Sequence, residues 1–306
     1  MPSPLNTVTP NLKQPKATIN KRLPRLKYFV SLTRFDRPIG TYLLLWPTLT
    51  ALWIASAGWP GWHLLLVFAL GTVLTRSAGC IINDLADKKF DGKVKRTQAR
   101  PLILGKVSPL EALLLAGSIT FGALLLVLTT NIYTVYMSVF AVIIAAIYPF
   151  MKRYTYLPQA FLGIAFSWGI PMTFTAVNNE IANVAWLLLT ANLLWVVAYD
   201  TQYAMVDRDD DVKLGLKSTA ILFAELDRFM IAVLQISFLA TLLLVTRSVE
   251  FSIYYYLGLS GAAGLFIYQH YLTWNRDREG CFKAFLNNHW VGLSVFLGVL
   301  AHHLLN

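Results

Sequence analysis

Nine stretches of largely apolar residues, each long enough to cross a bilayer as a helix, follow one another along this 306-residue chain. A helix of about 20 residues spans the hydrocarbon core and satisfies its own backbone hydrogen bonds, as a lipid environment requires. Only 14% of the residues are charged, whereas soluble domains carry about 25%. We therefore predict an all-α, polytopic membrane protein. The expected transmembrane helices cover residues 38–58, 62–83, 109–130, 132–150, 157–177, 184–206, 229–247, 253–273 and 289–305.

The basic residues are distributed unevenly between the segments that connect these helices. With nine helices, all of the 26 Lys and Arg residues except Arg247 lie on one side of the membrane. Because an excess of Lys and Arg marks the cytoplasmic side, we expect the N-terminus there and the C-terminus outside. Residues 1–28 are predicted to form a basic cytosolic tail and residues 29–306 the membrane-embedded domain. This distribution accounts for the net charge of +10 without a nucleic-acid partner.

Two acidic segments follow predicted helices on the cytoplasmic side. They read N-D-L-A-D-K-K-F-D at 83–91 and D-T-Q-Y-A-M-V-D-R-D-D-D at 200–211. Carboxylates beside a bilayer are costly, so their presence there points to function. Helical spacing of four and seven residues would align the members of each segment on one stripe. The first stripe holds Asn83, Asp87 and Asp91 with Asp84 beside it, and the second holds Asp200, Tyr203, Asp207 and Asp211.

Like charges four residues apart repel, so a divalent cation is expected to offset the repulsion within each stripe. Carboxylate oxygens suit Mg²⁺, which commonly completes its shell with water and substrate phosphates. Lys and Arg residues that neutralise phosphate lie next to both segments. They are Lys93, Lys95, Arg96, Arg100, Lys213 and Lys217. The two segments are therefore predicted to hold a diphosphate between them through Mg²⁺. Asp209 and Asp210 fall off the stripe and are expected to be solvated.

The two segments resemble the paired motifs of the UbiA prenyltransferase family. The family pattern N-D-x-x-D-x-x-x-D matches the first segment, and D-x-x-Y-A-x-x-D-x-x-x-D matches the second. Residues 32–47, 148–159 and 198–213 are similar to the bacterial branch of the family that acts on 4-hydroxybenzoate. The resemblance runs from about residue 25 to the C-terminus.

This resemblance implies nine transmembrane helices around a central cavity, in the bacterial inner membrane with the active site at the cytoplasmic face. It implies Mg²⁺-dependent transfer from polyprenyl diphosphate to the carbon ortho to the hydroxyl of 4-hydroxybenzoate, a step of ubiquinone biosynthesis, with membrane lipid around the chain. By motif position, the expected Mg²⁺ ligands are Asn83, Asp84, Asp87, Asp91, Asp207 and Asp211, of which Asp87, Asp91, Asp207 and Asp211 are the expected catalytic set. The expected substrate-binding residues are Arg100, Asp200, Tyr203 and Lys213, together with Arg34, Lys152 and Arg153 as candidates for the aromatic carboxylate.

Two other functions also use carboxylates near membrane helices. A cation transporter would more often place them at mid-membrane on broken helices, whereas here a basic segment adjoins them at the cytoplasmic end. A CDP-alcohol phosphatidyltransferase uses a pattern that resembles D-x-x-D-G-x-x-A-R. The sequence departs from it twice, because Lys88 stands three positions before Asp91 and Lys95 takes the Ala position.

Overall fold

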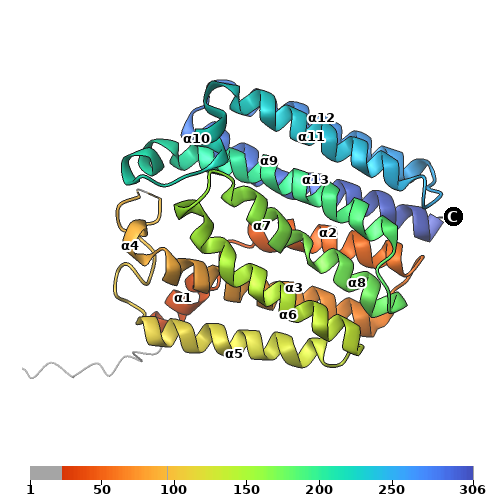
Figure 1. Ribbon diagram of the computed structural model, residues 1–306, viewed down its shortest axis with the longest axis horizontal. Coiled ribbons are helices and arrows are strands. Elements are labelled where there is room, and N and C mark those ends of the chain that lie inside the picture. The colour runs from red at the N-terminus through yellow and green to blue at the C-terminus, as the bar shows by residue number, and fades with distance from the viewer. Residues whose placement is uncertain (1–22, 95, 306) are drawn as a thin grey trace, which may run out of the picture.

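The computed structural model describes residues 23–94 and 96–305, and in that part of the chain all regular structure is helical (Figure 1). The helices that match the nine predicted ranges are α2 (Ile39–Ala55), α3 (Gly61–Ala86), α5 (Pro109–Val127), α6 (Ile132–Ile147), α7 (Pro158–Ser167) with α8 (Gly169–Asn178), α9 (Asn183–Leu214), α11 (Asp227–Val245), α12 (Ile253–Leu272) and α13 (Arg278–Leu305). The shorter elements are α1 (Leu23–Leu32), α4 (Lys88–Asp91), η1 (Tyr148–Arg153), α10 (Thr219–Phe223) and η2 (Ala224–Leu226).

Seven of the described helical spans are long and apolar enough to cross a membrane. Large apolar side chains such as Phe121 and Phe140 are exposed on their outer faces, which suits contact with lipid chains. The protein is therefore a multi-pass integral membrane protein. Helix α2, with 17 residues, is shorter than these spans, and α12 is not among the seven. The number of nine crossings accordingly stays a prediction.

The helices form a bundle in which α9 is central. Helix α9 packs against α7, α11 and α13, and α13 in turn packs against α2 and α12. Large side chains such as Leu52, Trp195 and Val291 are almost fully buried between these helices. Helix α9, which carries the second acidic segment, is therefore held by neighbouring helices on several sides.

Several boundaries differ from the prediction. Helix α9 continues past 206 to Leu214, so the second acidic segment is one unbroken helix. The first segment is broken, because α3 ends at Ala86 and α4 begins at Lys88. The span at 157–177 is divided into α7 and α8. Helix α1 crosses the predicted tail boundary at 28, and residues 1–22 of the tail lie outside the described residues.

Both acidic segments lie at the same end of the bundle. Figure 1 shows α4, which ends the first segment, and α10, which follows the second, at one end of the bundle, and the C-terminal end of α13 at the other. Polar segments that are 111 residues apart in sequence, such as those of Arg96 and Asp207, therefore meet in space.

Candidate active site

A cavity of about 700 Å³ opens between the two acidic segments. Its walls come from α2, α3, η1, α7, α9 and α13, together with the loop between α4 and α5. The eight polar motif residues line it, namely Asn83, Asp84, Asp87, Asp91, Asp200, Tyr203, Asp207 and Asp211. The two stripes predicted from helical spacing thus form facing parts of one site.

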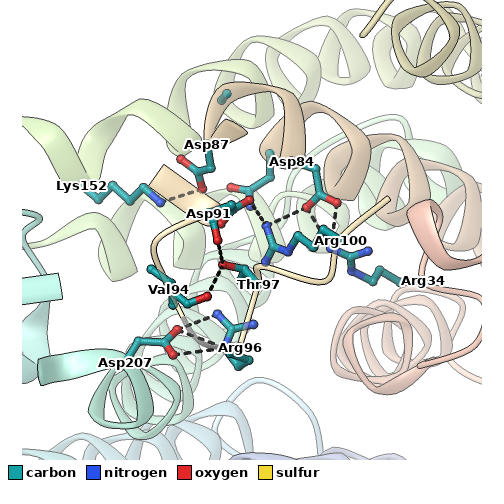
Figure 2. Close-up of polar contacts among 12 residues, drawn as sticks. Arg34, Asp84, Asp87, Asp91, Val94, Arg96, Thr97, Arg100, Lys152 and Asp207 are labelled. Carbon is teal, nitrogen blue, oxygen red and sulfur yellow. Dashed lines mark hydrogen bonds and ion pairs between the residues drawn. The ribbon is translucent and has the colours of Figure 1, made fainter. Parts of the chain in front are cut away.

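Each carboxylate of the first motif is held by a basic side chain (Figure 2). Asp84 accepts hydrogen bonds from Arg34 Nη2 at 2.8 and 2.9 Å. Arg100 Nη1 lies 2.9 Å from Asp84 and 2.5 Å from Asp91. Lys152 Nζ lies 2.6 Å from Asp87 Oδ2. These pairs keep a dense group of buried carboxylates in place by charge balance.

The second motif is paired through the loop at 92–108. Arg96 of that loop lies 2.6 Å from Asp207 Oδ2, and its guanidinium lies over the ring of Tyr203 at 4.5 Å from the centroid. Burial alone would lower the pKa of Arg96, but Tyr203 and Asp207 raise it above its ordinary value, so the side chain stays charged. Since Arg100 belongs to the same loop, this one loop contacts both motifs.

Local backbone geometry orients several of the charged side chains of the site. Asp87 caps α3, with its N–H bonded to the carbonyl of Asn83 at 2.9 Å, and the turn then redirects the chain into α4. Thr97 Oγ1 donates to the Asp91 carbonyl at 2.7 Å and holds the loop against α4. Arg34 adopts a left-handed φ of 61° just after α1 and bonds the carbonyl of Ser31 at 2.7 Å. Its guanidinium thereby faces Asp84.

The donor set fits a divalent cation that shares its shell with substrate. In the described part of the chain, no three His, Cys, Asp or Glu side chains converge to form a closed metal site. Mg²⁺ typically needs only one or two carboxylates when phosphates and water supply the rest. Asp87 Oδ1 is buried without a hydrogen-bond partner. Burial, aided by Asp87 and Asp84, raises the pKa of the Asp91 carboxyl although Arg100 opposes the shift, so an added cation would relieve this site.

Not every predicted site residue faces the cavity. Arg34, Arg100 and Lys152 line it, whereas Arg153 does not: its Nη2 donates to the carbonyl of Ala86 at 2.6 Å and its guanidinium lies over Phe90. Lys213 is exposed, and Lys217 lines the cavity instead.

Of the two acidic residues expected to be solvated, only Asp209 is, with its side chain 72% exposed. Asp210 is buried and lies 3.0 Å from Arg278, which corrects that expectation. The early start of α13, at Arg278 rather than at 289, supplies this cation and so explains how a carboxylate becomes buried there.

Sequence reasoning missed a basic residue within the cavity wall. Arg76 lies ten residues before the end of α3, inside a membrane-spanning helix, and lines the cavity. It forms no ion pair within residues 23–94 and 96–305, and its buried Nε has no hydrogen-bond partner. Its guanidinium lies 5.5 Å from the ring centroid of Phe166. The sequence contained a signal for this residue, because an arginine within an apolar membrane span is costly and its presence there points to a function.

Residues 44–293 match the model of the UbiA prenyltransferase family. The chain belongs to this family. Membership agrees with the facing acidic segments and decides against the transporter and the CDP-alcohol enzyme as explanations of them.

Curated UbiA relatives cover nearly the whole chain. A protein of Pseudomonas putida (strain W619), described as 4-hydroxybenzoate octaprenyltransferase, is 57% identical over 94% of this chain and 97% of its own length. One of Colwellia psychrerythraea with the same description is 59% identical over 89% of this chain and 95% of its own. Among solved structures, a UbiA homologue from Aeropyrum pernix K1 has a TM-score of 0.76 at 23% identity, covering 85% of this chain and 97% of that one. A homologue from Archaeoglobus fulgidus, bound to GPP and Mg²⁺, has a TM-score of 0.65 at 16% identity over 90% and 99%. These likenesses support the helical fold.

Proposed function

We propose that this chain transfers a polyprenyl group from polyprenyl diphosphate to the ring carbon ortho to the hydroxyl of 4-hydroxybenzoate, giving 3-polyprenyl-4-hydroxybenzoate for ubiquinone biosynthesis. The observation that carries the proposal is the single cavity into which both acidic motifs and their basic partners project. The relatives described as 4-hydroxybenzoate octaprenyltransferases support the choice of acceptor.

For the diphosphate, we propose that the first and second motifs bind Mg²⁺ from opposite sides of the cavity. The ligands would come from Asn83, Asp84, Asp87, Asp91, Asp207 and Asp211. When bound, Mg²⁺ would neutralise the charge that builds on the departing pyrophosphate. Arg96, Arg100 and Lys152 now neutralise carboxylates, and once a cation takes over that role they can donate to phosphate oxygens. The position of Lys213 gives no support to its predicted contact with substrate.

For the aromatic carboxylate, Arg76 is a better partner than the three predicted candidates. Arg34 and Lys152 are already paired with Asp84 and Asp87, and Arg153 lies outside the cavity. Arg76 is a cavity guanidinium whose Nε is buried and unpartnered, and a buried guanidinium without a carboxylate is expensive. Arg76 and Asp200 line the same cavity.

The chemistry then follows from the cavity walls. The allylic C–O bond breaks, pyrophosphate leaves with the bonding electrons, and the ring carbon beside the phenol forms the new bond to the allylic cation. The proton on that carbon must then leave. Asp200 and Asp211 are the two motif carboxylates that form no ion pair among the described residues, and Asp200, which is outside the proposed Mg²⁺ ligand set, is the candidate to accept the proton. Tyr203 and Phe285, with ring centroids 4.5 Å apart, line the cavity and can face the cation. Apolar residues such as Leu162 help to exclude water.

The test uses membranes that contain the chain, Mg²⁺, labelled 4-hydroxybenzoate and polyprenyl diphosphates of several lengths. We expect a lipid-soluble product substituted at the carbon ortho to the hydroxyl. Absence of that product with every donor would refute the proposal.

We further propose that the chain lies in the bacterial inner membrane with the cavity open to the cytoplasm. Lys93 lies two residues after Asp91, the last residue of the first motif, and its side chain is exposed. A Lys93→Cys variant should react with an impermeant thiol reagent only after the membrane is opened. Labelling from the periplasm of intact cells would overturn this orientation.

A further inference from the structure

The helix that carries the second motif is held on its far side by a group of buried polar side chains, here called the amide cluster. It consists of Gln202 and Trp195 of α9, Gln235 of α11, Gln269 of α12 and Asn288 of α13. Each of these side chains is at most 2% exposed. A polar group this size inside a membrane protein calls for an explanation, because apolar side chains would fill the same space without hydrogen bonds.

The cluster is a continuous hydrogen-bonded chain across four helices. Trp195 Nε1 donates to Asn288 Oδ1 at 2.9 Å, and Asn288 Nδ2 donates to Gln202 Oε1 at 2.9 Å. Gln202 Nε2 donates to Gln269 Oε1 at 3.1 Å, and Gln235 Nε2 donates to the same oxygen at 2.9 Å. Both ends of the Gln202 amide are therefore used, and its orientation is determined by α12 and α13.

Gln202 stands inside the second motif but points away from the cavity. At about 100° per residue, it lies about 140° around α9 from Asp207 and about 180° from Asp211. It does not line the cavity, whereas Asp200, Tyr203 and Asp207 do. The preceding residue, Thr201, also faces outward and contacts Thr219 Oγ1 of α10 at 2.7 Å. The motif thus has a cavity side and an anchoring side.

The anchoring side determines how α9 is rotated. Apolar contacts between membrane helices tolerate rotation, because neighbouring lipid is as apolar as a leucine side chain. A helix radius of about 5–6 Å means that a turn of about 10° moves a carboxylate by about 1 Å. Misplacement on that scale costs about 100-fold in rate. Interhelical hydrogen bonds in membranes average only about 0.6 kcal/mol each, so stability alone explains the cluster poorly.

We propose that the amide cluster is a positioning device for the second motif, in which Gln202 fixes the rotation of α9 so that Asp207 and Asp211 face the first motif. This inference rests on the proposed function, since it assigns Gln202 a role in the same transfer. Gln202 acts through the carboxylates and touches no substrate.

The primary test compares Gln202→Leu with a matched control, Asn192→Leu. Asn192 is also a buried amide of α9 and donates to Ser167 Oγ at 2.9 Å, but it belongs to neither the motif nor the cluster. We expect Gln202→Leu to lower kcat by about 10- to 100-fold and to raise the Mg²⁺ concentration needed for half-maximal rate. The KM for 4-hydroxybenzoate should change by less than about twofold, because Arg76, the proposed partner of the aromatic carboxylate, lies on α3 and not on α9. Asn192→Leu should retain kcat at a similar melting temperature.

A compensating exchange separates positioning from folding. Gln202→Asn is one methylene too short to keep both contacts, and Asn288→Gln adds one methylene on the partner helix. Each single variant should lose activity, and the double variant should recover part of it, because the longer side chain at 288 restores that contact but not the one with Gln269. Equal losses in Gln202→Leu and Asn192→Leu, or no recovery in a double variant that melts like the native chain, would overturn the inference.

Failure of the positioning role of Gln202 can be distinguished from failure of the proposed prenyl transfer. If the native chain transfers no prenyl group, the proposed function fails, and the rise in melting temperature with Mg²⁺ and pyrophosphate still reports on the motifs. Gln202→Leu should reduce that rise and Asn192→Leu should not. An unchanged rise in Gln202→Leu would overturn the positioning role in either case.

Discussion

Asp207 and Asp209 lie two residues apart on α9 and provide a sharp test of the site. Both carboxylates are paired with an arginine, Asp207 with Arg96 at 2.6 Å and Asp209 with Arg278 at 3.2 Å. They differ in surroundings, because the side chain of Asp207 is 11% exposed and lines the cavity while that of Asp209 is 72% exposed. Replacing each in turn by asparagine removes one charge at nearly constant volume.

The expected magnitudes follow from these distances. At an effective dielectric constant of about 20, charges 2.6 Å apart attract by about 6 kcal/mol before desolvation. Arg96 is 28% exposed, so water returns to it after substitution, and we expect a net loss of only about 1–2 kcal/mol in unfolding free energy. Turnover should suffer more, by about 100-fold or about 2.7 kcal/mol in the barrier, because the lost charge acts where pyrophosphate develops its own.

The assay measures labelled 4-hydroxybenzoate transfer and melting temperature in the same purified samples, with and without Mg²⁺ and pyrophosphate. Asp207→Asn should lose both turnover and the stabilisation by Mg²⁺ and pyrophosphate. Asp209→Asn should keep turnover within about twofold, as exposed ion pairs contribute little. If Asp207→Asn retained a third of native turnover, or if both variants lost activity equally, the assignment of the second motif would be wrong.

Three further predictions concern the acceptor and the metal. Arg76→Lys should raise the KM for 4-hydroxybenzoate about 10-fold or more, with little change in the KM for the prenyl diphosphate. Arg153→Ala should leave the KM for 4-hydroxybenzoate unchanged. If steady-state kinetics showed the larger rise for Arg153→Ala, the role in binding the acceptor would return to Arg153. Gly40→Ala would put a methyl group 2.3 Å from Arg76 Nη2, so it should displace this flexible side chain and raise the KM for 4-hydroxybenzoate at nearly native stability. The control is Gly71→Ala, whose methyl group meets nothing within 4 Å. Equal KM values in the two glycine variants would contradict a role of Arg76 in binding the acceptor. Chelation of divalent cations should abolish transfer, and Mg²⁺ but not Na⁺ at equal ionic strength should restore it; full activity in the chelator would refute the need for a metal.

Local patterns predicted much of the site. Spacings of three, four and seven residues place Asp200, Tyr203, Asp207 and Asp211 on one side of α9, and all four line the cavity. The same reasoning was less complete for the first motif, because α3 ends at Ala86 and the carboxylates continue into a turn. Hydropathy predicted helices at all nine ranges but misplaced ends, since caps and tertiary contacts determine where a helix stops. Helix α9 extends to Leu214 for that reason.

Single residues near the motifs were harder to assign. Arg153 stands in a stretch that resembles the family and carries the right charge, yet its guanidinium bonds the end of α3. Arg76 was counted only as one more basic residue, although it lines the cavity, forms no ion pair in the described part of the chain and has a buried Nε without a hydrogen-bond partner. The sequence gives only the charge and the chain position of each residue, and these do not distinguish Arg76 from Arg153. Which of them faces the cavity depends on helix rotation and on the neighbouring helices.

The sequence by itself determined the helical membrane class, the two acidic motifs and the class of chemistry, because hydropathy, helical period and motif spacing are properties of contiguous residues. Only the tertiary structure decided which side chains contact the motif residues. The pairing of Arg96 with Asp207, the place of Arg76 in the cavity and the contact of Gln202 with Asn288 join residues far apart in the chain. Such contacts depend on the relative rotation and depth of packed helices, and a linear pattern carries no direct measure of either.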